Sequence, residues 1–541
     1  MRCLALLAGL LLLSPAWARG GDGVAFQGSL QLRATSERNV PGTAVLYDPT
    51  ADDFHLGSYL HTEGSDDFGS TLAALALEGR HLDGDLHWVL AVDSGELRRQ
   101  HFYRTTSVCW SPKTASGLAV PGSGECGLYR LSRLRWARII VPVEETLPDS
   151  PEVTSNGRPV RDEASHTWFV REAYLAYSLG RARFLTFSAG RRRATVADGY
   201  VYDDYATGVE VHADLGAIGP PWDLSAAAFQ PTRDLPGTVQ GLTPMVVLRA
   251  DYLPSLFAHA GLFAAGMRQR TGGLGDVLRT AVEERLVSVA SSSDPSTPMH
   301  RAADQLLAAT LATDYSSDAT LGWLGTSGKL NLSSWQRIGF TAALLGGEIH
   351  TATTGTGVVV AENVHLRGQL ASLRYDADLG RGVSAGLGFL YLSGDGLPRA
   401  NLGSAGVIDP ATGTYRGFVA VAPYITETNL FFGGGLSESF ADRQAATPGV
   451  NGRGVIAPAA SLGFDPTESV SVRAKGAYLR ADAQGPLGGR VYGTETDLEL
   501  SWQVASWLVL GAELDALFPG DFFRGRDPLT KGLLALDVLT P

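Results

Sequence analysis

The segment Gly493–Phe523 alternates polar and apolar residues in two runs, which are separated at Ala505 and Ser506. Successive residues of a strand point to opposite faces of a sheet, so each run predicts a strand with one polar and one apolar face. Trp502 and Trp507 flank the predicted turn, as in the aromatic girdle of a membrane barrel. The predicted polar face carries the carboxylates Glu495, Asp497, Glu499, Glu513 and Asp515.

Similar alternation recurs along most of the chain, with clear examples near residues 26–35, 86–93 and 470–478. Many of these runs reach about nine residues, the length that a tilted strand needs to cross a membrane. Further strands are expected near residues 167–179, 183–191, 207–215, 222–229, 244–252, 256–268, 304–314, 337–350, 364–378, 382–393, 416–424, 428–438 and 455–464.

The connections between these runs fall into two kinds. Short turns are expected at 81–84 and 378–382, whereas long polar loops are expected near 38–69, 99–165, 270–303 and 438–454. Residues 276–290 have the pattern of a helix within one such loop. Short turns on one rim and long loops on the other are typical of bacterial outer-membrane barrels. We therefore expect an all-β fold, a single transmembrane antiparallel β-barrel with short periplasmic turns and long extracellular loops.

The first residues have the pattern of a secretory signal peptide. Arg2 precedes an apolar run from Leu4 to Leu13, and Ala16-Trp17-Ala18 forms a small-x-small cleavage site. We expect residues 1–18 to be removed and residues 19–541 to form the barrel. The rest of the chain contains no uninterrupted run of about 18 to 20 apolar residues, which argues against a helical membrane protein.

The composition fits many strands joined by turns in one folded unit. The chain has 65 Gly, 17 Tyr and 10 Trp, and no low-complexity linker divides it. Its formal net charge of −12 argues against a strongly anion-selective pore, although long loops can hold most of the acidic residues.

Cys109 and Cys126 are the cysteines that follow the signal peptide, and both lie in the long insertion near 99–165. They occur in a Gly-, Ser- and Pro-rich stretch without neighbouring metal ligands. In an exported protein this pattern predicts a loop-closing disulfide, with free thiols as the alternative.

Four short motifs resemble alginate-export-type outer-membrane channels. They are REAYL at 171–175, LTFSAGR at 185–191 followed by DGYVYDDYATG at 198–208, GFLYLSGDG at 388–396, and the closing segment with FPGDFF at 518–523. The resemblance implies a monomeric barrel of about 18 strands, within about 16 to 20, that passes an anionic polysaccharide or a smaller solute. The chain departs from that family in its last residues, 533–541, which contain no aromatic residue.

An anion pathway needs cationic side chains that face the lumen, preferably arginines. The candidates for a constriction are Arg171, Arg191, Arg192, Arg193, Asp203 and Asp204. Arginines at strand ends also decorate the rim, bind lipopolysaccharide phosphates or pair with carboxylates, so these alternatives stay open. The acidic face of the closing hairpin needs cationic neighbours, and Arg473 and Lys475 on the preceding strand are suitably placed. We interpret this ladder as structural, with a cation-preferring lumen as the alternative.

The sequence gives no support to an enzyme, a cofactor or a nucleic-acid-binding protein. The 11 histidines are scattered, and the chain contains no H-E-x-x-H motif, no G-x-S-x-G elbow and no Gly-rich phosphate loop. The pairs Asp52-Asp53, Asp66-Asp67 and Asp203-Asp204 lack the spacing of a calcium loop. We expect no catalytic residues, no metal and no cofactor.

The expected function is an outer-membrane channel for passive passage or export of an organic solute or polysaccharide. A non-conducting structural or surface-interaction barrel is the first alternative. A secreted soluble carbohydrate-binding protein or lyase is the second. The expected partners of the channel are outer-membrane lipid and lipopolysaccharide, the barrel-assembly machinery and the solute.

Overall fold

The computed structural model describes most of the predicted barrel. The described residues are 23–38, 65–83, 85–96, 103–110, 125–132, 140–146, 166–180, 183–231, 244–255, 257–269, 315–353, 363–395, 401–402, 408–409, 413–421, 423–432, 453–484, 489–523 and 527–539. The predicted signal peptide, the predicted strand at 304–314 and the predicted helix at 276–290 lie outside these residues.

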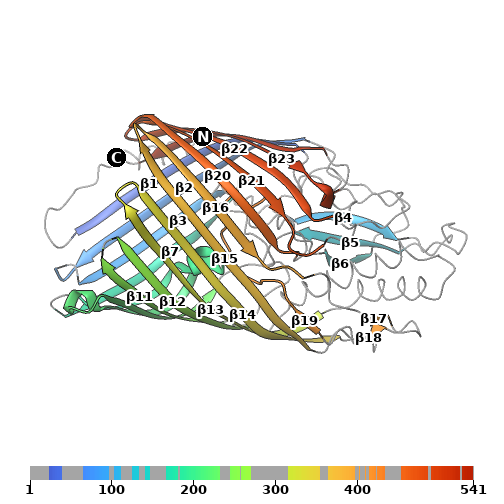
Figure 1. The fold of residues 1–541 in the computed structure, drawn as a ribbon, viewed down its shortest axis with the longest axis horizontal. Helices are drawn as coiled ribbons and strands as arrows, with labels where there is room; N and C mark the ends of the chain where they lie inside the picture. The colour runs from blue at the N-terminus through green and yellow to red at the C-terminus, as the bar shows by residue number, and fades with distance from the viewer. Residues whose placement is uncertain are drawn as a thin grey trace, which may run out of the picture.

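The described strands form one closed antiparallel barrel of 18 strands (Figure 1), as expected. Each strand pairs with its neighbours in chain order, and β24 pairs with β1 to close the ring. The strands are β1 (Gly23–Arg38), β2 (Ser65–His81), β3 (Leu86–Glu96), β7 (His166–Leu179), β8 (Leu185–Val196), β9 (Tyr202–Asp214), β10 (Trp222–Pro231), β11 (Met245–Ser255), β12 (Ala258–Gln269), β13 (Tyr315–Ser333), β14 (Gln336–Thr353), β15 (Asn363–Gly380), β16 (Val383–Leu392), β20 (Val455–Thr467), β21 (Val470–Arg480), β22 (Val491–Ala505), β23 (Leu508–Pro519) and β24 (Leu529–Leu539).

Smaller elements lie in the connections. In the long insertion, β4 (Tyr103–Trp110), β5 (Glu125–Ser132) and β6 (Ile140–Thr146) form a separate sheet. Cys109 and Cys126 are opposite each other in the β4–β5 register, and their disulfide stays a prediction. The other short elements are β17 (Asn401–Leu402), β18 (Ile408–Asp409), β19 (Gly413–Tyr415) and the 3₁₀ helices η3 (Ala197–Gly199), η4 (Leu215–Ile218) and η7 (Asp521–Phe523).

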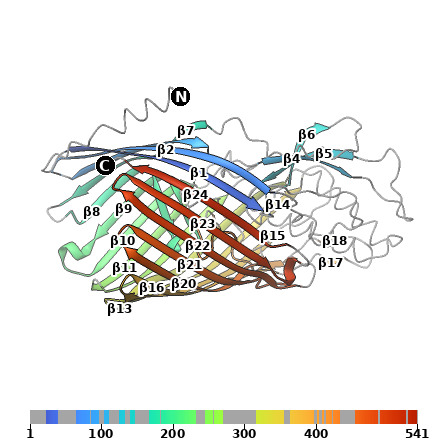
Figure 2. The same ribbon diagram turned by 90° about the horizontal axis from the view of Figure 1, so that it is seen from above.

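The two rims of the barrel differ in the length of their connections. Figure 2 shows the strands that these connections join, seen from above. Tight turns follow β2, β7, β11, β13, β15, β20 and β22, which places them all on one rim. The expected turns at 81–84 and 378–382 are among them. Long connections follow β1, β3, β12 and β16 on the opposite rim. We call these the short-turn rim and the long-loop rim.

The outer face of the barrel is apolar. On β22, Leu498 is 45% exposed and Trp502 46% exposed, whereas Glu495 on the opposite face is 0% exposed. Because the interior of a bilayer offers no hydrogen-bond partners, a closed barrel with such an exterior is suited to lipid. Among the described residues, no helix is long and apolar enough to span a membrane.

Aromatic side chains form girdles at both edges of this apolar band. Near the short-turn rim, an exposed row comprises Trp222, Tyr252, Trp335, Trp502 and Trp507. Nearer the long-loop rim, the exposed Tyr478 and Phe518 both lie in register with Thr494. Apolar exterior, paired girdles and unequal rims together are those of a bacterial outer-membrane barrel, so the protein belongs in that membrane.

Two expected strands are wrong. Residues 416–421 and 423–432 form no strand, although 416–424 and 428–438 alternate in part. Their apolar side chains are buried, with Phe418 at 0% and Phe432 at 4% exposed, because the segment lies inside the barrel. An apolar run that is buried on all sides gives no periodic signal that separates a strand from an irregular segment. The sequence also predicted no strand at β2, β13 or β24.

Candidate functional site

The end of the β8–β9 hairpin leaves the barrel wall. Pairing of β7 with β8 stops at Ala173 and Arg191, and pairing of β9 with β10 stops at Ala206 and Pro231. Pairing between β8 and β9 nevertheless continues to Val196. Residues 192–205, which we call the inward hairpin, therefore pair with each other but not with the neighbouring wall strands β7 and β10.

Two glycines mark the place where the hairpin departs. Gly190 and Gly208 are directly opposite each other in the β8–β9 register, and Gly190 has a φ of 128°. A Cβ on Gly190 would lie 2.2 Å from the carbonyl oxygen of Ala173, and one on Gly208 would lie 2.2 Å from that of Ala228. Only glycine permits this backbone conformation and these close approaches.

We expect Gly190→Ala to lower the free energy of unfolding by at least about 2 kcal/mol, because the new Cβ meets backbone and the φ is unfavourable. Urea unfolding of the protein in lipid vesicles, followed by tryptophan fluorescence, measures this change. The matched control is Gly346→Ala in β14, where a Cβ would have no neighbour within 4 Å. Equal stability of the two variants would contradict a special role for Gly190.

The tip of the inward hairpin reaches strands on another part of the wall. Thr341 of β14 donates a hydrogen bond to Asp198 at 2.5 Å, and the hydroxyls of Tyr200 and Ser372 of β15 lie 2.7 Å apart. Ala197 and Asp198 at the turn have φ values of 56° and 50°. Left-handed conformations of non-glycine residues are typical of segments that the surrounding structure holds in place.

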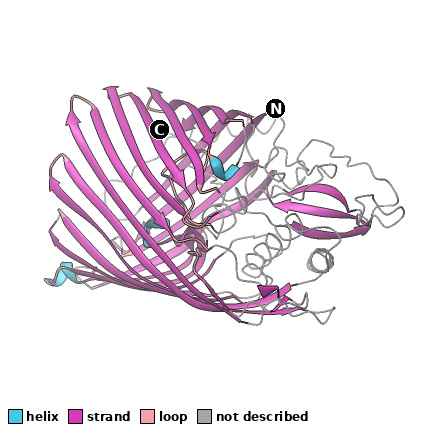
Figure 3. Cartoon of the chain, turned by 45° about the vertical axis from the view of Figure 1, so that its right-hand side comes forward, coloured by secondary structure: helices cyan, strands magenta, loops and turns pink. Residues whose placement is uncertain are grey.

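A second segment, which belongs to the β16–β20 connection, lies inside the barrel, where Figure 3 draws the loops in pink. We call residues 416–432 the inward loop, of which residue 422 is not described. The indole Nε1 of Trp323 on β13 donates to the carbonyl of Val419 at 2.9 Å. Gly368 on β15 leaves room for the loop, since a Cβ there would lie 2.7 Å from Cα of Phe418.

The two inward segments are tied to each other. The amide of Val421 donates to the carbonyl of Val201, and the amide of Tyr424 donates to the carbonyl of Gly199, both at 2.9 Å. The Tyr200 hydroxyl donates to Glu427 at 2.7 Å. The loop and the hairpin therefore form one hydrogen-bonded bridge inside the barrel.

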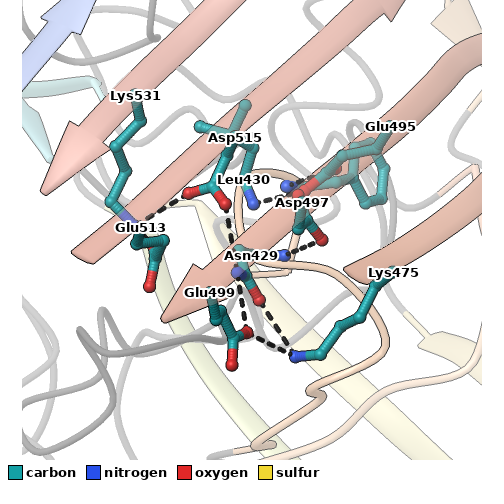
Figure 4. Close-up of polar contacts among 10 residues, drawn as sticks. Asn429, Leu430, Lys475, Glu495, Asp497, Glu499, Glu513, Asp515 and Lys531 are labelled. Carbon is teal, nitrogen blue, oxygen red and sulfur yellow. Dashed lines mark hydrogen bonds and ion pairs between the residues drawn. The ribbon is translucent and has the colours of Figure 1, made fainter. Parts of the chain in front are cut away.

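The far end of the inward loop is anchored on the acidic face of β22 and β23 (Figure 4). The amide group of Asn429 donates to Glu499 at 3.0 Å and to Asp515 at 3.1 Å, and its carbonyl oxygen accepts from Lys475 at 3.2 Å. The backbone amide of Asn429 donates to Asp497 at 3.1 Å. Asn429 is 0% exposed, so these bonds satisfy a side chain that has no access to water.

Glu495 holds the next two residues of the loop. Its Oε1 accepts from the amide of Leu430 at 2.5 Å, and its Oε2 accepts from the amide of Phe431 at 2.9 Å. Phe431 then stacks near Tyr492, with ring centroids 5.0 Å apart. One carboxylate thus fixes two successive amides, and such charge-assisted bonds are among the stronger hydrogen bonds of proteins.

Two lysines balance part of the acidic face. Lys475 pairs with Glu499 at 2.9 Å. Lys531 of β24, which is fully buried, forms an ion pair with Glu513 and lies 3.4 Å from Asp515. Lys531 is not among the residues predicted from the sequence because its strand was not predicted, although a lone lysine in the mostly apolar run 529–539 was a usable signal.

Arg473 is two residues from Lys475 on β21 and therefore lies on the same face of the strand. It lies in register with Glu499, but it is exposed and makes no ion pair with a described residue, whereas Lys475 reaches Glu499 diagonally. Of the five predicted carboxylates, Glu495, Asp497, Glu499 and Asp515 bond to the inward loop, and Glu513 pairs with Lys531.

The predicted arginine cluster is divided among separate partners. Arg171 pairs with the buried Asp93 at 3.2 Å, Arg192 pairs with Glu210, and Arg193 holds Asp203 through two bonds of 2.7 Å. The Nε of Arg191 donates to the carbonyl of Val170 at 2.8 Å, beyond the point where β8 stops pairing with β7. Asp204 accepts from the amide of Tyr205 at 2.7 Å.

A cavity of about 240 Å³ lies where the inward hairpin bends away from the wall. Its lining residues include Arg192, Glu210, Ser225, Phe229, Val247 and Arg249. Towards the short-turn rim, the lumen wall carries further polar pairs. His212 lies 2.5 Å from Asp223, and Asp251 lies 2.5 Å from Arg249 and 3.0 Å from His259. In the described part of the chain, no group of three or more His, Cys, Asp or Glu residues could hold a metal ion.

Comparisons with known proteins give only loose likenesses. No family model matches the chain, and no curated protein matches it. A BenF-like porin from Pseudomonas fluorescens Pf-5 shares 9% identity over 96% of this chain and 99% of its own, with a TM-score of 0.48. OprD of Pseudomonas aeruginosa shares 11% identity over 98% of both chains, with a TM-score of 0.42.

OccAB4 of Acinetobacter baumannii shares 9% identity over 95% of this chain and 97% of its own, with a TM-score of 0.41. Because these TM-scores are below 0.5, the fold is assigned from the strand pairing of this chain alone, and no function is inferred from these porins. The resemblance to alginate-export channels finds no support in these likenesses and stays a prediction.

Proposed function

We propose that the protein is an outer-membrane channel for small polar solutes, in which the inward hairpin and the inward loop form the constriction. The observation that carries this proposal is the hydrogen-bonded bridge inside a barrel whose lumen wall carries charged pairs towards the short-turn rim. A barrel of 18 strands is wide enough to enclose an aqueous path. The charged pairs on the lumen wall, such as Arg249 with Asp251, suit water and polar solutes.

The constriction favours small solutes over a polysaccharide chain. Val419, Ala420 and Leu430 of the inward loop are each at most 2% exposed, so loop side chains occupy space that a polymer would need. The arginines of the predicted cluster are already bonded to protein partners, which weakens the case for an anion filter. We therefore propose no fixed charge preference for the solute.

Conductance tests the proposal directly. Purified protein that folds in vesicles, shown by heat-modifiable gel migration, should give discrete current steps in planar lipid bilayers and swell liposomes in small sugars. It should not swell liposomes in large dextrans. A folded barrel without current or swelling would instead favour the non-conducting alternative, which the apolar packing of the inward loop supports. Contacts with lipopolysaccharide, recognition by the assembly machinery and the monomeric state remain part of the proposal.

A further inference from the structure

The contact between the two inward segments contains a carboxylate that lacks a cationic partner at bonding distance among the described residues. Glu427 of the inward loop accepts a hydrogen bond at Oε1 from Tyr200, and Tyr200 in turn lies 2.7 Å from Ser372. The second oxygen, Oε2, is buried and has no hydrogen-bond partner in the described structure. An ionised carboxylate in this position keeps a buried oxygen without a hydrogen-bond partner among the described residues, which is unfavourable.

The hydrogen bonds form a chain with a definite direction. Since the single hydroxyl proton of Tyr200 is donated to Glu427, the hydroxyl of Ser372 donates to Tyr200. The chain runs from the wall strand β15 through the inward hairpin to the inward loop. It therefore joins three parts of the barrel that are distant in sequence, and it does so at the middle of the bridge.

The surroundings of this chain contain few other charges. Asp198 lies near Tyr200, and Arg374 of β15 lies near enough to Glu427 to favour its charged form. Arg374 is itself 3.0 Å from Asp376 and is largely exposed, so its effect on Glu427 is shared and screened. Burial raises the pKa of Glu427 above its ordinary value. This effect exceeds the opposing effects of the Tyr200 hydrogen bond, of the backbone amides of Glu427 and Thr426, and of Arg374.

We propose that the chain Ser372–Tyr200–Glu427 is a proton-operated latch, which keeps the inward loop on the inward hairpin and loosens the constriction when Glu427 ionises. This inference rests on the proposed channel function. Once the loop separates, Glu427 is hydrated and has an ordinary carboxyl pKa, of about 4.3. The stabilisation of the closed latch is therefore complete below that ordinary value and is lost as the pH rises through the raised pKa of the closed form.

We expect the conductance of the unaltered protein to increase severalfold, or its open time to lengthen, when the pH is raised from acidic to neutral in planar bilayers. Glu427→Gln, which cannot ionise, should stay in the low-conductance form and lose this pH step. Tyr200→Phe, which removes the hydroxyl that bonds to both Ser372 and Glu427, should conduct more than the unaltered protein at acidic pH. The matched control is Glu468→Gln at the β20–β21 turn, an exposed position that should keep the pH step.

A pH step that persists in Glu427→Gln, or a conducting channel without any pH step, would overturn the latch and leave the channel function intact. Absence of current in the unaltered protein and in Tyr200→Phe would overturn the channel function. The latch is then tested by cross-linking in a protein that also carries Cys109→Ser and Cys126→Ser. Val201→Cys and Val421→Cys place thiols on residues joined by a backbone hydrogen bond.

The rate at which the two introduced thiols cross-link is measured with Glu427 present and in the Glu427→Gln variant. Taking the ratio of the two rates corrects for the faster reaction of thiolates at high pH. The ratio of the rate with Glu427 to the rate with Gln should fall severalfold as the pH rises. A constant ratio would overturn the latch without reference to conductance.

Discussion

Replacing Lys531 with methionine should lower the free energy of unfolding of the barrel by about 3–5 kcal/mol. The lysine is fully buried on β24, where it pairs with Glu513 and lies 3.4 Å from Asp515. Methionine fills a similar volume but leaves Glu513 and Asp515 without their nearest cation. Because the site is fully buried, water cannot take the place of the lysine ammonium group. Urea unfolding in lipid vesicles, followed by tryptophan fluorescence, measures the loss.

Two further variants make this result specific to the buried pair. Arg473→Met removes a cation from an exposed position on β21, and it should change stability by no more than about 0.5 kcal/mol. Adding Glu513→Gln to Lys531→Met should restore part of the stability, because the double variant no longer buries the unpaired charge of Glu513. If Arg473→Met and Lys531→Met cost the same, the buried ion pair is not what stabilises β24.

Replacing Asn429 with alanine should free the inward loop and raise the single-channel conductance. The side chain makes three hydrogen bonds to charged partners, and each such bond is worth about 1.5–3 kcal/mol. A net loss of roughly 3 kcal/mol would raise the population of the released loop about a hundredfold. The change is read as larger or longer current steps in planar bilayers.

The control for this experiment is Asn331→Ala at the short-turn end of β13, away from the inward loop. It should leave the conductance unchanged. The Asn429 variant must also retain heat-modifiable migration, which shows that the barrel itself is still closed. Unchanged conductance in a folded Asn429→Ala barrel would mean that the loop does not limit the path.

The sequence was most informative where one face of a strand meets lipid. The alternation in 493–523 predicted both faces of β22 and β23 and the turn between Trp502 and Trp507, as the structure shows. A strand between lipid and lumen needs apolar side chains on the lipid side and favours polar side chains on the lumen side. Because successive residues point to opposite sides, this difference produces an alternating pattern in the sequence. The pattern therefore located most barrel strands, although it missed β2, β13 and β24.

Alternation failed inside the barrel. The inward loop is apolar because it is enclosed by protein, and its run FVAVAPYITETNLFF was mistaken for two strands. The arginines at 191–193 are adjacent in sequence, yet they bond to a backbone carbonyl, to Glu210 and to Asp203, respectively. Adjacent residues of a strand point apart, so a cluster in sequence does not become a cluster in space.

The sequence by itself determined that this chain forms a barrel with a lipid-facing exterior, because the strands have apolar residues at alternate positions, on the side that faces lipid. Only the tertiary structure decided what fills the lumen. The partners of Asn429 are Asp497, Glu499, Asp515 and Lys475, which lie on three strands 46 to 86 residues away. Such contacts depend on which strands face each other across the ring, and no local pattern along the chain contains that information.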